Sequence, residues 1–312
     1  MEDVIRTKDL TKIYSLGRRR ILAVDKLNLK VGRGEIFGLL GPNGAGKTTT
    51  IHMLLGLTPP TSGEGYVLDF DIKRRSREIR KIAGLVPERA GFYWDLTAMQ
   101  NLKYFASLSD IPRDVALDRI NWALDFVGLS KWKNVPVKGF SRGMVQRLAL
   151  AQVLIKQPKV IFLDEPTAGL DPRGSMMYRR LVKRLNKEYN VTILLSSHLL
   201  PEVRKVCHKV GFMRNGRIVR VGKIDELLRN VKFKIVVELD KLDKEIVEEV
   251  EDISGVEVVK VKGNRFYLTA DNDVRLEISK IVFKHGRLIK TLRVLRPTLE
   301  EIFFSIMGGG VE

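Results

Sequence analysis

The sequence predicts an α/β fold with a mixed sheet at its core, followed by a small α+β domain. Three observations lead to this prediction. A glycine-rich turn at 41–48 stands between a short apolar run at 35–40 and the start of a helical segment. Two further apolar runs, at 160–163 and 191–197, have the length and continuity of strands buried on both faces of a sheet. Beyond residue 231 the pattern changes to short alternating strands and two helical segments.

Length and composition restrict the classes of protein that this chain can belong to. Its 312 residues, 44% hydrophobic and 29% charged, suit one large globular domain and a small one. The apolar runs are much shorter than the roughly 20 residues of a membrane span. Cys207 is the only cysteine, which excludes a disulfide framework and leads us to expect a cytoplasmic setting. The net charge of +18 would suit nucleic acid or an anionic membrane, but the dispersed cations indicate neither strongly.

The N-terminal part predicts strands around the first helix. Residues 4–14 alternate as a strand, and a second strand is expected at 21–29. Turn formers at 58–63 return the chain to a short strand at 66–68, and 82–88 predicts another strand that ends abruptly. Tyr14 could stack on a nucleotide base, although an aromatic residue in a strand is more often part of a core.

The glycine-rich turn predicts a phosphate site. Its sequence matches the pattern G-x-x-x-x-G-K-[ST] between a strand and a helix, where backbone N–H groups and the helix dipole favour an anion. Lys47 would reach the β and γ phosphates, and the Thr48 hydroxyl would bind Mg²⁺. An ordinary glycine-rich turn is the alternative, but all the required residue types are present. The predicted nucleotide-binding residues here are Gly41, Pro42, Asn43, Gly44, Ala45, Gly46, Lys47, Thr48 and Thr49.

A helical insertion is expected between two strands of the sheet, over about 89–158. Apolar residues recur at helical spacing around 102–108 and over 115–129. A strongly apolar helix follows at 145–155, and Ser141 is a suitable N-cap for it.

Polar residues at the ends of the two buried runs are candidates for catalysis. Asp164 and Glu165 follow the run at 160–163, and two carboxylates at a buried strand end are costly unless they have a function. We expect Asp164 to hold Mg²⁺ and Glu165 to orient the attacking water. The alternative is that these two acids are loop residues that cap the next helix. His198 ends the run at 191–197, where it could reach a γ-phosphate, although a lone histidine is usually structural.

Taken together and in this order, these motifs resemble the nucleotide-binding subunit of an ABC transporter over residues 4–228. The segment 140–144, Phe-Ser-Arg-Gly-Met, resembles the family signature LSGGQ and matches it at Ser141 and Gly143. Such variants are found in the branch that serves ABC-2 type export systems. Residues 168–171, Ala-Gly-Leu-Asp, also fit the family order. Glu88 stands where the family usually has glutamine, so the amide is replaced by a carboxylate.

The resemblance implies a P-loop NTPase of the ABC cassette type that uses ATP and Mg²⁺. It implies catalytic roles for Lys47, Glu165 and His198, and metal binding by Thr48, Glu88 and Asp164. It also implies that the nucleotide contacts Tyr14, Glu88, Ser141, Gly143 and Asp171 besides the phosphate loop.

The same resemblance implies two kinds of protein partner. In the family, two cassettes pair head to tail around two ATP molecules, so that Ser141 and Gly143 of one face the phosphate loop of the other. The second cassette would be another copy or a relative. Hydrolysis would drive a separate membrane permease docked near 88–104, with export as the expected direction. The chain would then lie peripherally on the inner face of the cell membrane, and no nucleic acid is expected.

The last quarter predicts a ferredoxin-like unit at 229–296, after a cassette at 1–228. Its expected order is strand, helix, strand, strand, helix, strand, and a further helix and tail are expected at 297–312. The predicted segments are 233–239, 243–252, 256–261, 265–269, 274–285 and 288–295. They hold no catalytic constellation. Regulation, dimer support and ligand sensing all stay open as the role of this unit.

Two other functions share part of this pattern. An ABC-type ATPase acting on nucleic acid or ribosomes would suit the charge of +18. Such proteins generally carry two cassettes or a long coiled coil, and this chain has neither. A kinase shares the phosphate loop but does not explain the signature segment, the carboxylate pair and His198 together. A transport ATPase is therefore the leading interpretation. The transported substrate is not readable, because its contacts lie in the membrane subunits.

Overall fold

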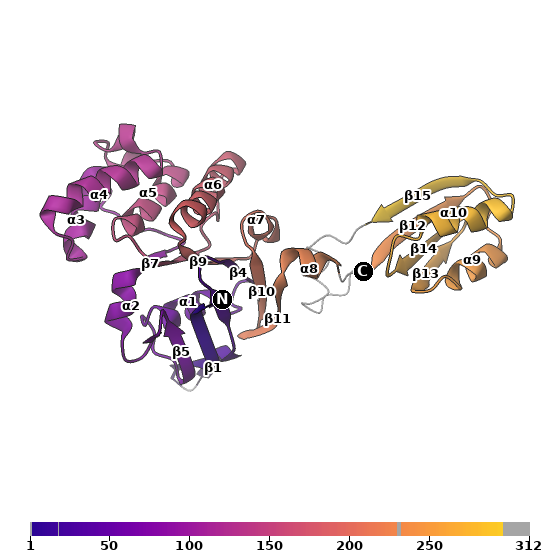
Figure 1. Ribbon diagram of the computed structural model, residues 1–312, viewed down its shortest axis with the longest axis horizontal. Helices are drawn as coiled ribbons and strands as arrows, with labels where there is room; N and C mark the ends of the chain where they lie inside the picture. The colour runs from indigo at the N-terminus through magenta and orange to yellow at the C-terminus, as the bar shows by residue number, and fades with distance from the viewer. Residues whose placement is uncertain (1, 18, 230–231, 296–312) are drawn as a thin grey trace. The chain divides into compact units, whose positions relative to one another are not determined.

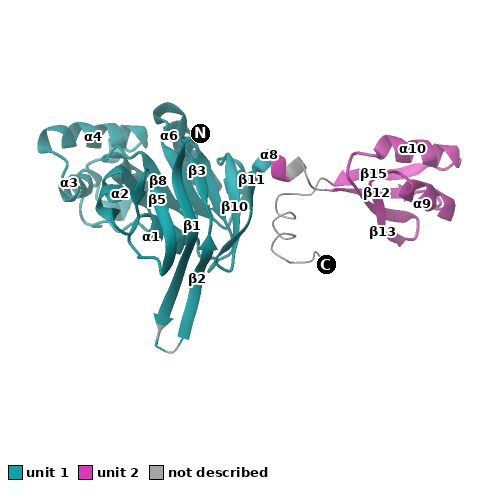
Figure 2. Ribbon diagram, turned by 60° about the horizontal axis from the view of Figure 1, so that its bottom comes forward, with its two compact units in different colours: residues 1–224 teal, residues 225–312 magenta. Residues whose placement is uncertain are grey.

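The computed structural model describes residues 2–17, 19–229 and 232–295, and its contacts divide the chain into two compact units. The first unit is 1–224 and the second is 225–312 (Figure 2). This division falls within helix α8 (Ile224–Arg229), close to the predicted boundary between 228 and 229. The predicted helix and tail at 297–312 lie outside the described residues.

An antiparallel sheet forms one part of the first unit. Its strand order is β2-β1-β5-β6, and β3 pairs with β1. The strands are β1 (Asp3–Leu16), β2 (Arg19–Leu27), β3 (Lys30–Gly32), β5 (Ser62–Val67) and β6 (Phe70–Asp71). The strands predicted at 4–14, 21–29 and 66–68 are therefore present, with ends shifted by a few residues.

A six-stranded sheet forms the centre of the first unit, in the order β11-β10-β4-β9-β8-β7. All neighbours from β10 to β7 pair in parallel, and β11 is an antiparallel edge strand, so the sheet is mixed as predicted. Every residue of β4, β8 and β9 is buried, which explains their continuous apolar sequences. The strands are β4 (Ile36–Leu40), β7 (Ala83–Val86), β8 (Val160–Asp164), β9 (Thr192–Ser197), β10 (Lys209–Arg214) and β11 (Arg217–Lys223).

Three helices make up the predicted helical insertion: α3 (Ala98–Leu108), α4 (Arg113–Phe126) and α5 (Arg142–Leu154). They gather on one side of the first unit (Figure 1). Two short 3₁₀ helices, η1 (Ser130–Trp132) and η2 (Val137–Gly139), connect α4 to α5. A capping box between Thr97 and Gln100 begins α3, since each side chain binds the other residue's backbone N–H. Ser141 begins α5, as predicted, by accepting a hydrogen bond from the Met144 N–H.

The remaining helices of the first unit are α1 (Lys47–Leu54), α2 (Ser76–Ile82), α6 (Pro172–Tyr189) and α7 (Leu200–Arg204). Our sequence prediction did not include α2, α6 or α7, nor the hairpin of β10 and β11. The strand predicted at 82–88 starts at Ala83, because Ile82 is the last residue of α2. In α6 the starting signals are clear: Asp171 caps the helix and Pro172 occupies its first turn.

The second unit contains the six predicted elements in the predicted order. They are β12 (Phe233–Leu239), α9 (Lys244–Glu251), β13 (Val256–Lys262), β14 (Arg265–Ala270), α10 (Arg275–Lys284) and β15 (Ile289–Leu295). The strands form an antiparallel sheet in the order β13-β14-β12-β15. Alternate residues of β12 and β14 pack against the apolar faces of α9 and α10 to form a separate core. The name ferredoxin-like for this unit remains a prediction based on that order.

The phenylalanines of the second unit provide a matched test of its core. Phe266 is fully buried, whereas Phe283 is 84% exposed. Phe266→Ala should lower the free energy of unfolding of this unit by about 3–5 kcal/mol, and Phe283→Ala should change it by less than about 0.5 kcal/mol. Limited proteolysis at increasing urea concentration measures the difference. The fluorescence of the tryptophans, which all lie in the first unit, should report an unchanged transition there. Equal protease resistance of the two variants would contradict this account of the core.

Candidate functional site

The glycine-rich loop connects β4 to α1, and two of its glycines are required by close backbone packing. A Cβ atom on Gly41 would lie 2.3 Å from the Met213 carbonyl oxygen, and one on Gly46 would lie 2.3 Å from that of Ala23. Gly44 and Gly46 also have φ angles of +79° and +102°, which side chains rarely allow. A Cβ on Gly44 would meet no atom within 4 Å. The loop is therefore packed tightly on its inner side and open at Gly44.

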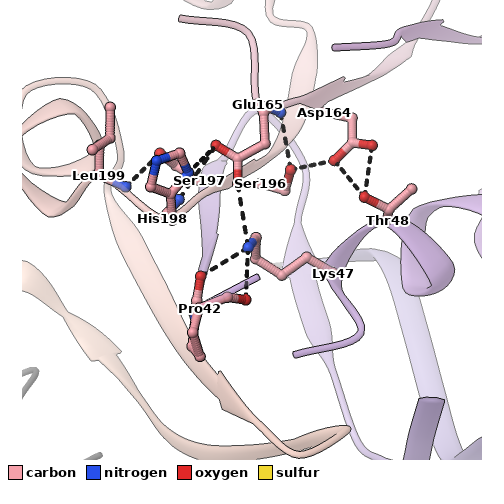
Figure 3. A network of polar contacts seen from close by, with 10 residues as sticks. Pro42, Lys47, Thr48, Asp164, Glu165, Ser196, Ser197, His198 and Leu199 are labelled. Atoms are coloured by element: carbon pink, nitrogen blue, oxygen red, sulfur yellow. Dashed lines mark hydrogen bonds and ion pairs between the residues drawn. The ribbon is translucent and has the colours of Figure 1, made fainter. Parts of the chain in front are cut away.

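Lys47 is held inside the loop rather than in solvent. Its Nζ donates hydrogen bonds to the carbonyl oxygens of Gly41 at 2.8 Å and Pro42 at 3.1 Å (Figure 3). Its side chain is only 6% exposed, and Nζ lies 3.2 Å from Oε1 of Glu165. The loop thus positions a buried ammonium group beside the start of α1, where backbone N–H groups have no partner within the helix.

A hydroxyl group and a carboxylate meet next to this ammonium. Thr48 Oγ1 lies 3.0 and 2.8 Å from the two carboxylate oxygens of Asp164, at the end of β8. Oδ1 of Asp164 also accepts a 2.5 Å hydrogen bond from the Ser196 hydroxyl. Asp164 is buried, so these hydroxyl groups replace the water that its charge loses.

Glu165 has a strained backbone and a partly unsatisfied carboxylate. Its φ of +47° is uncommon for a residue with a side chain. Oε2 lies 2.9 Å from Nδ1 of His198 and accepts a 3.3 Å hydrogen bond from the His198 backbone N–H. Oε1 is buried and makes no hydrogen bond, since its ion pair with Lys47 lacks hydrogen-bond geometry. A further polar group is therefore needed at Oε1.

Ser196 is a residue of this network that we did not predict. Its hydroxyl links the Asp164 carboxylate to the backbone of Glu165, because it donates to Asp164 Oδ1 and accepts a 3.0 Å hydrogen bond from the Glu165 backbone N–H. Asp164 and Ser196 are direct partners across the parallel strands β8 and β9. The sequence contained a usable signal: polar residues that end two adjacent parallel strands lie at the same edge of the sheet.

Two predicted site residues have no contact with this network in the described part of the chain. Tyr14 is half-buried in β1, with Nζ of Lys12 4.9 Å from its ring centroid. Glu88 is exposed after β7, and its side chain makes no hydrogen bond or ion pair with the residues that the structure describes.

The signature residues and Asp171 also make their contacts outside this network. Asp171 caps α6 by accepting a 2.6 Å hydrogen bond from the Gly174 N–H. A Cβ on Gly143 would meet no atom within 4 Å, so this side of α5 is open. The guanidinium of Arg142 packs against Gly169, where a Cβ would lie 2.0 Å from Nη1. The start of α5 therefore contacts the loop that precedes α6.

The network fits a phosphate anion together with a hard divalent cation. A helix start and a buried ammonium favour the anion. Hydroxyl and carboxylate oxygens, here of Thr48 and Asp164, are the ligands that Mg²⁺ prefers. The unsatisfied Oε1 of Glu165 faces Lys47 and could accept a hydrogen bond from a water molecule. Among the described residues, no helix combines the length and the apolar character needed to cross a bilayer.

The chain is similar to ATP-binding proteins of transporters. A family model described as "ABC transporter" matches residues 24–168. The bacitracin transport ATP-binding protein BcrA of Bacillus licheniformis is 37% identical over 312 residues, which cover 99% of each chain.

Solved structures agree with this likeness. CbiO1 from Clostridium perfringens, part of the ABC transporter complex cbiONQ, has a TM-score of 0.66 at 28% identity, over 81% of this chain and 96% of that one. The dimeric ATP-binding cassette MJ0796, in a post-hydrolysis state with ADP and Pi, has a TM-score of 0.64 at 27% identity, over 70% and 98%. With its loop, its carboxylate pair and a relative that matches along almost its whole length, the chain belongs to the ABC transporter family as an ATP-binding and ATP-hydrolysing subunit.

Proposed function

We propose that this subunit hydrolyses Mg-ATP with the residues gathered at the phosphate loop and thereby powers export through a separate permease. One observation supports the proposal most strongly. Lys47, Thr48, both carboxylates and His198 form a single connected network at the carboxyl ends of β4, β8 and β9. These strand ends are where nucleotide-binding α/β folds place their ligands.

In this proposal the loop and its lysine bind the triphosphate. The N–H groups at the start of α1 and the Lys47 ammonium would hold phosphate oxygens, with Gly44 leaving the approach open. Thr48 and Asp164 would hold Mg²⁺, with the exposed carboxylate of Glu88 as a further ligand. The bound cation would neutralise charge that develops on the phosphates. Tyr14 would stack on the base, and Thr49 would contact the nucleotide as the last residue of the phosphate-binding segment.

Glu165 and His198 would prepare the attacking water. Oε1 of Glu165 is the buried acceptor that lacks a hydrogen bond, so the attacking water would donate its hydrogen bond to this atom. His198 contacts the other oxygen of the same carboxylate and would fix its orientation while its ring approaches the γ-phosphate. When phosphate draws Lys47 away, Glu165 loses its ion pair and gains strength as an acceptor.

The open side of α5 supports a two-fold pairing of cassettes. Ser141 is exposed, and no atom lies near the Cβ position of Gly143, so a second subunit can approach both. In such a pair the start of α5 and Asp171 would face the nucleotide of the partner subunit. The similar cassette MJ0796 is dimeric in two solved structures, one of them with ADP and Pi. We propose that two copies of this chain pair in the same manner.

We further propose that the pair docks on a permease at the inner face of the membrane. BcrA matches the chain along 99% of its length, whereas the MJ0796 cassette covers only 70%, so the second unit is shared with the bacitracin transport protein. Export, in an ABC-2 type system, is the direction proposed from this likeness. The permease would approach the surface around 88–104, which includes the exposed Tyr93, Trp94 and Tyr104.

The Glu165→Gln variant tests the pairing. Glutamine keeps the shape of the side chain but cannot accept the proton, so hydrolysis should fall by about 10² to 10⁴-fold while Mg-ATP stays bound. Light scattering should then show a dimer only in the presence of Mg-ATP. The Lys47→Ala, Glu165→Gln double variant is the control, since it lacks the ammonium and should stay monomeric. A Glu165→Gln protein that binds ATP but remains monomeric would refute pairing of two copies.

Two neighbouring serines test the carboxylate network. Ser196→Ala removes the hydroxyl shared by Asp164 and Glu165 and should lower ATPase activity or Mg²⁺ affinity by about 10 to 100-fold. Ser197→Ala is the matched control, because the Ser197 hydroxyl only accepts the Leu199 N–H and contacts neither carboxylate. Steady-state hydrolysis at varied Mg²⁺ concentration compares the two. If both variants lose the same activity, Ser196 has no special role in orienting the carboxylates.

A further inference from the structure

A cavity of about 780 Å³ lies away from the phosphate loop, between α2, the turn after α3, and α4. Five of the residues that line it carry a positive charge and one carries a negative charge. The cations are Arg77, Arg80, Lys81, Arg119 and Lys156, and the carboxylate is Asp110. Its remaining wall is formed mainly by Leu108, Ile111 and Pro112.

None of these five cations forms an ion pair within the described part of the chain, although the charge of Lys81 acts on Glu78 at longer range. Asp110 is the one carboxylate among the residues that line the cavity. The Nη1 atom of Arg80 points to the carbonyl oxygens of Leu55 and Gly56, at 3.3 and 3.4 Å. Nζ of Lys156 donates to the carbonyl oxygens of Arg80 and Ala83. Backbone carbonyls thus fix two of the positive groups in place without neutralising them.

The electrostatic cost of this arrangement is visible at Lys156. Burial lowers the pKa of its ammonium, and repulsion by Arg80 lowers it further. An anion in the cavity would offset that repulsion and stabilise the charged form of the lysine. Five cations held in a concave site with a single carboxylate indicate that an anionic ligand supplies the remaining negative charge.

We propose that this cavity binds an anion that carries several clustered phosphate groups. Guanidinium groups match phosphate oxygens in bidentate geometry, and three of the five cations are arginines. The volume falls in the range of small-molecule sites and exceeds the space that a single phosphate needs. No aromatic side chain lines the cavity, so the base stacking typical of single-stranded nucleic acid is not provided.

This site is distinct from the nucleotide site. The cavity lies at the start of two strands, because Ala83 begins β7 and Lys156 precedes β8. The phosphate loop, Asp164 and Glu165 lie at the opposite, carboxyl ends of their strands. No residue of the loop or of the carboxylate network lines the cavity. Three of the cations (Arg77, Arg80 and Lys81) come from α2, and Arg119 comes from α4 of the helical insertion. A bound anion would therefore connect α2 to the helical insertion. The ligand would therefore act as a regulator of the first unit.

Calorimetric titration with inorganic tripolyphosphate tests the proposal. The full chain is first saturated with ADP in the absence of Mg²⁺, so that the phosphate loop is filled. We expect one further binding event per chain, weakened by added salt. The Arg77→Gln, Arg119→Gln double variant should bind tripolyphosphate at least about tenfold more weakly. The control is Arg74→Gln, Arg113→Gln, which removes the same charge from exposed positions near α2 and on α4 outside the cavity.

Retained binding in the control and loss in the cavity variant support the site. Equal weakening in both double variants, or no event beyond ADP, would overturn it. ADP affinity should be the same in all three proteins, which shows that the variants are folded. Flotation with vesicles of cardiolipin, whose headgroup carries two phosphates, in phosphatidylcholine identifies the natural source. Capture that depends on Arg77 and Arg119 assigns the site to a lipid headgroup, and its absence assigns it to a soluble oligophosphate.

Discussion

The parallel register of β4, β9 and β8 is the constraint on which the site depends. Leu40 pairs with Ser197, and Asp164 pairs with Ser196, so three strands end at the same edge. The chain continues from these ends into the phosphate loop, into Glu165 and into His198. A shift of one strand by one residue would turn Asp164 or Ser196 to the other face of the sheet and separate the Ser196 hydroxyl from the Asp164 carboxylate. The full burial of these strands is what fixes the register.

Burial also makes the charges of the site dependent on one another. The side chains of Lys47 and Glu165 are 6% and 11% exposed, so neither charge is well solvated. Each is tolerable because the other is present and because backbone carbonyls and hydroxyl groups surround them. A triphosphate adds negative charge that competes for the ammonium. The same low exposure that costs stability in the free protein therefore couples phosphate binding at Lys47 to the environment of the Glu165 carboxylate.

Sequence patterns predicted the features of the site that are local in the chain. The run Val160–Asp164 was recognisable as a buried strand because its apolar residues are contiguous, and the loop because its glycines and Lys47 have fixed spacing. The role of Ser196 was missed because it depends on pairing across strands, which the sequence of one strand does not contain. Helix α6 was missed although Asp171 and Pro172 begin it, since strands and motifs guided the prediction there. In the second unit each element is short and its turns are marked by residues such as Gly263, so local patterns were sufficient.

The departure of the signature segment from the family pattern has a structural explanation in Arg142. At this position the family has a glycine, and here a guanidinium packs against Gly169 in the loop that links the end of β8 to α6. Gly169 has a φ of +67° and no side chain, so the contact needs glycine on that side. Arg142 therefore connects the helix that would face the partner's nucleotide to the segment that follows Glu165 in the same chain. The arginine therefore adds a contact between two segments of one subunit that the glycine of the family pattern could not make.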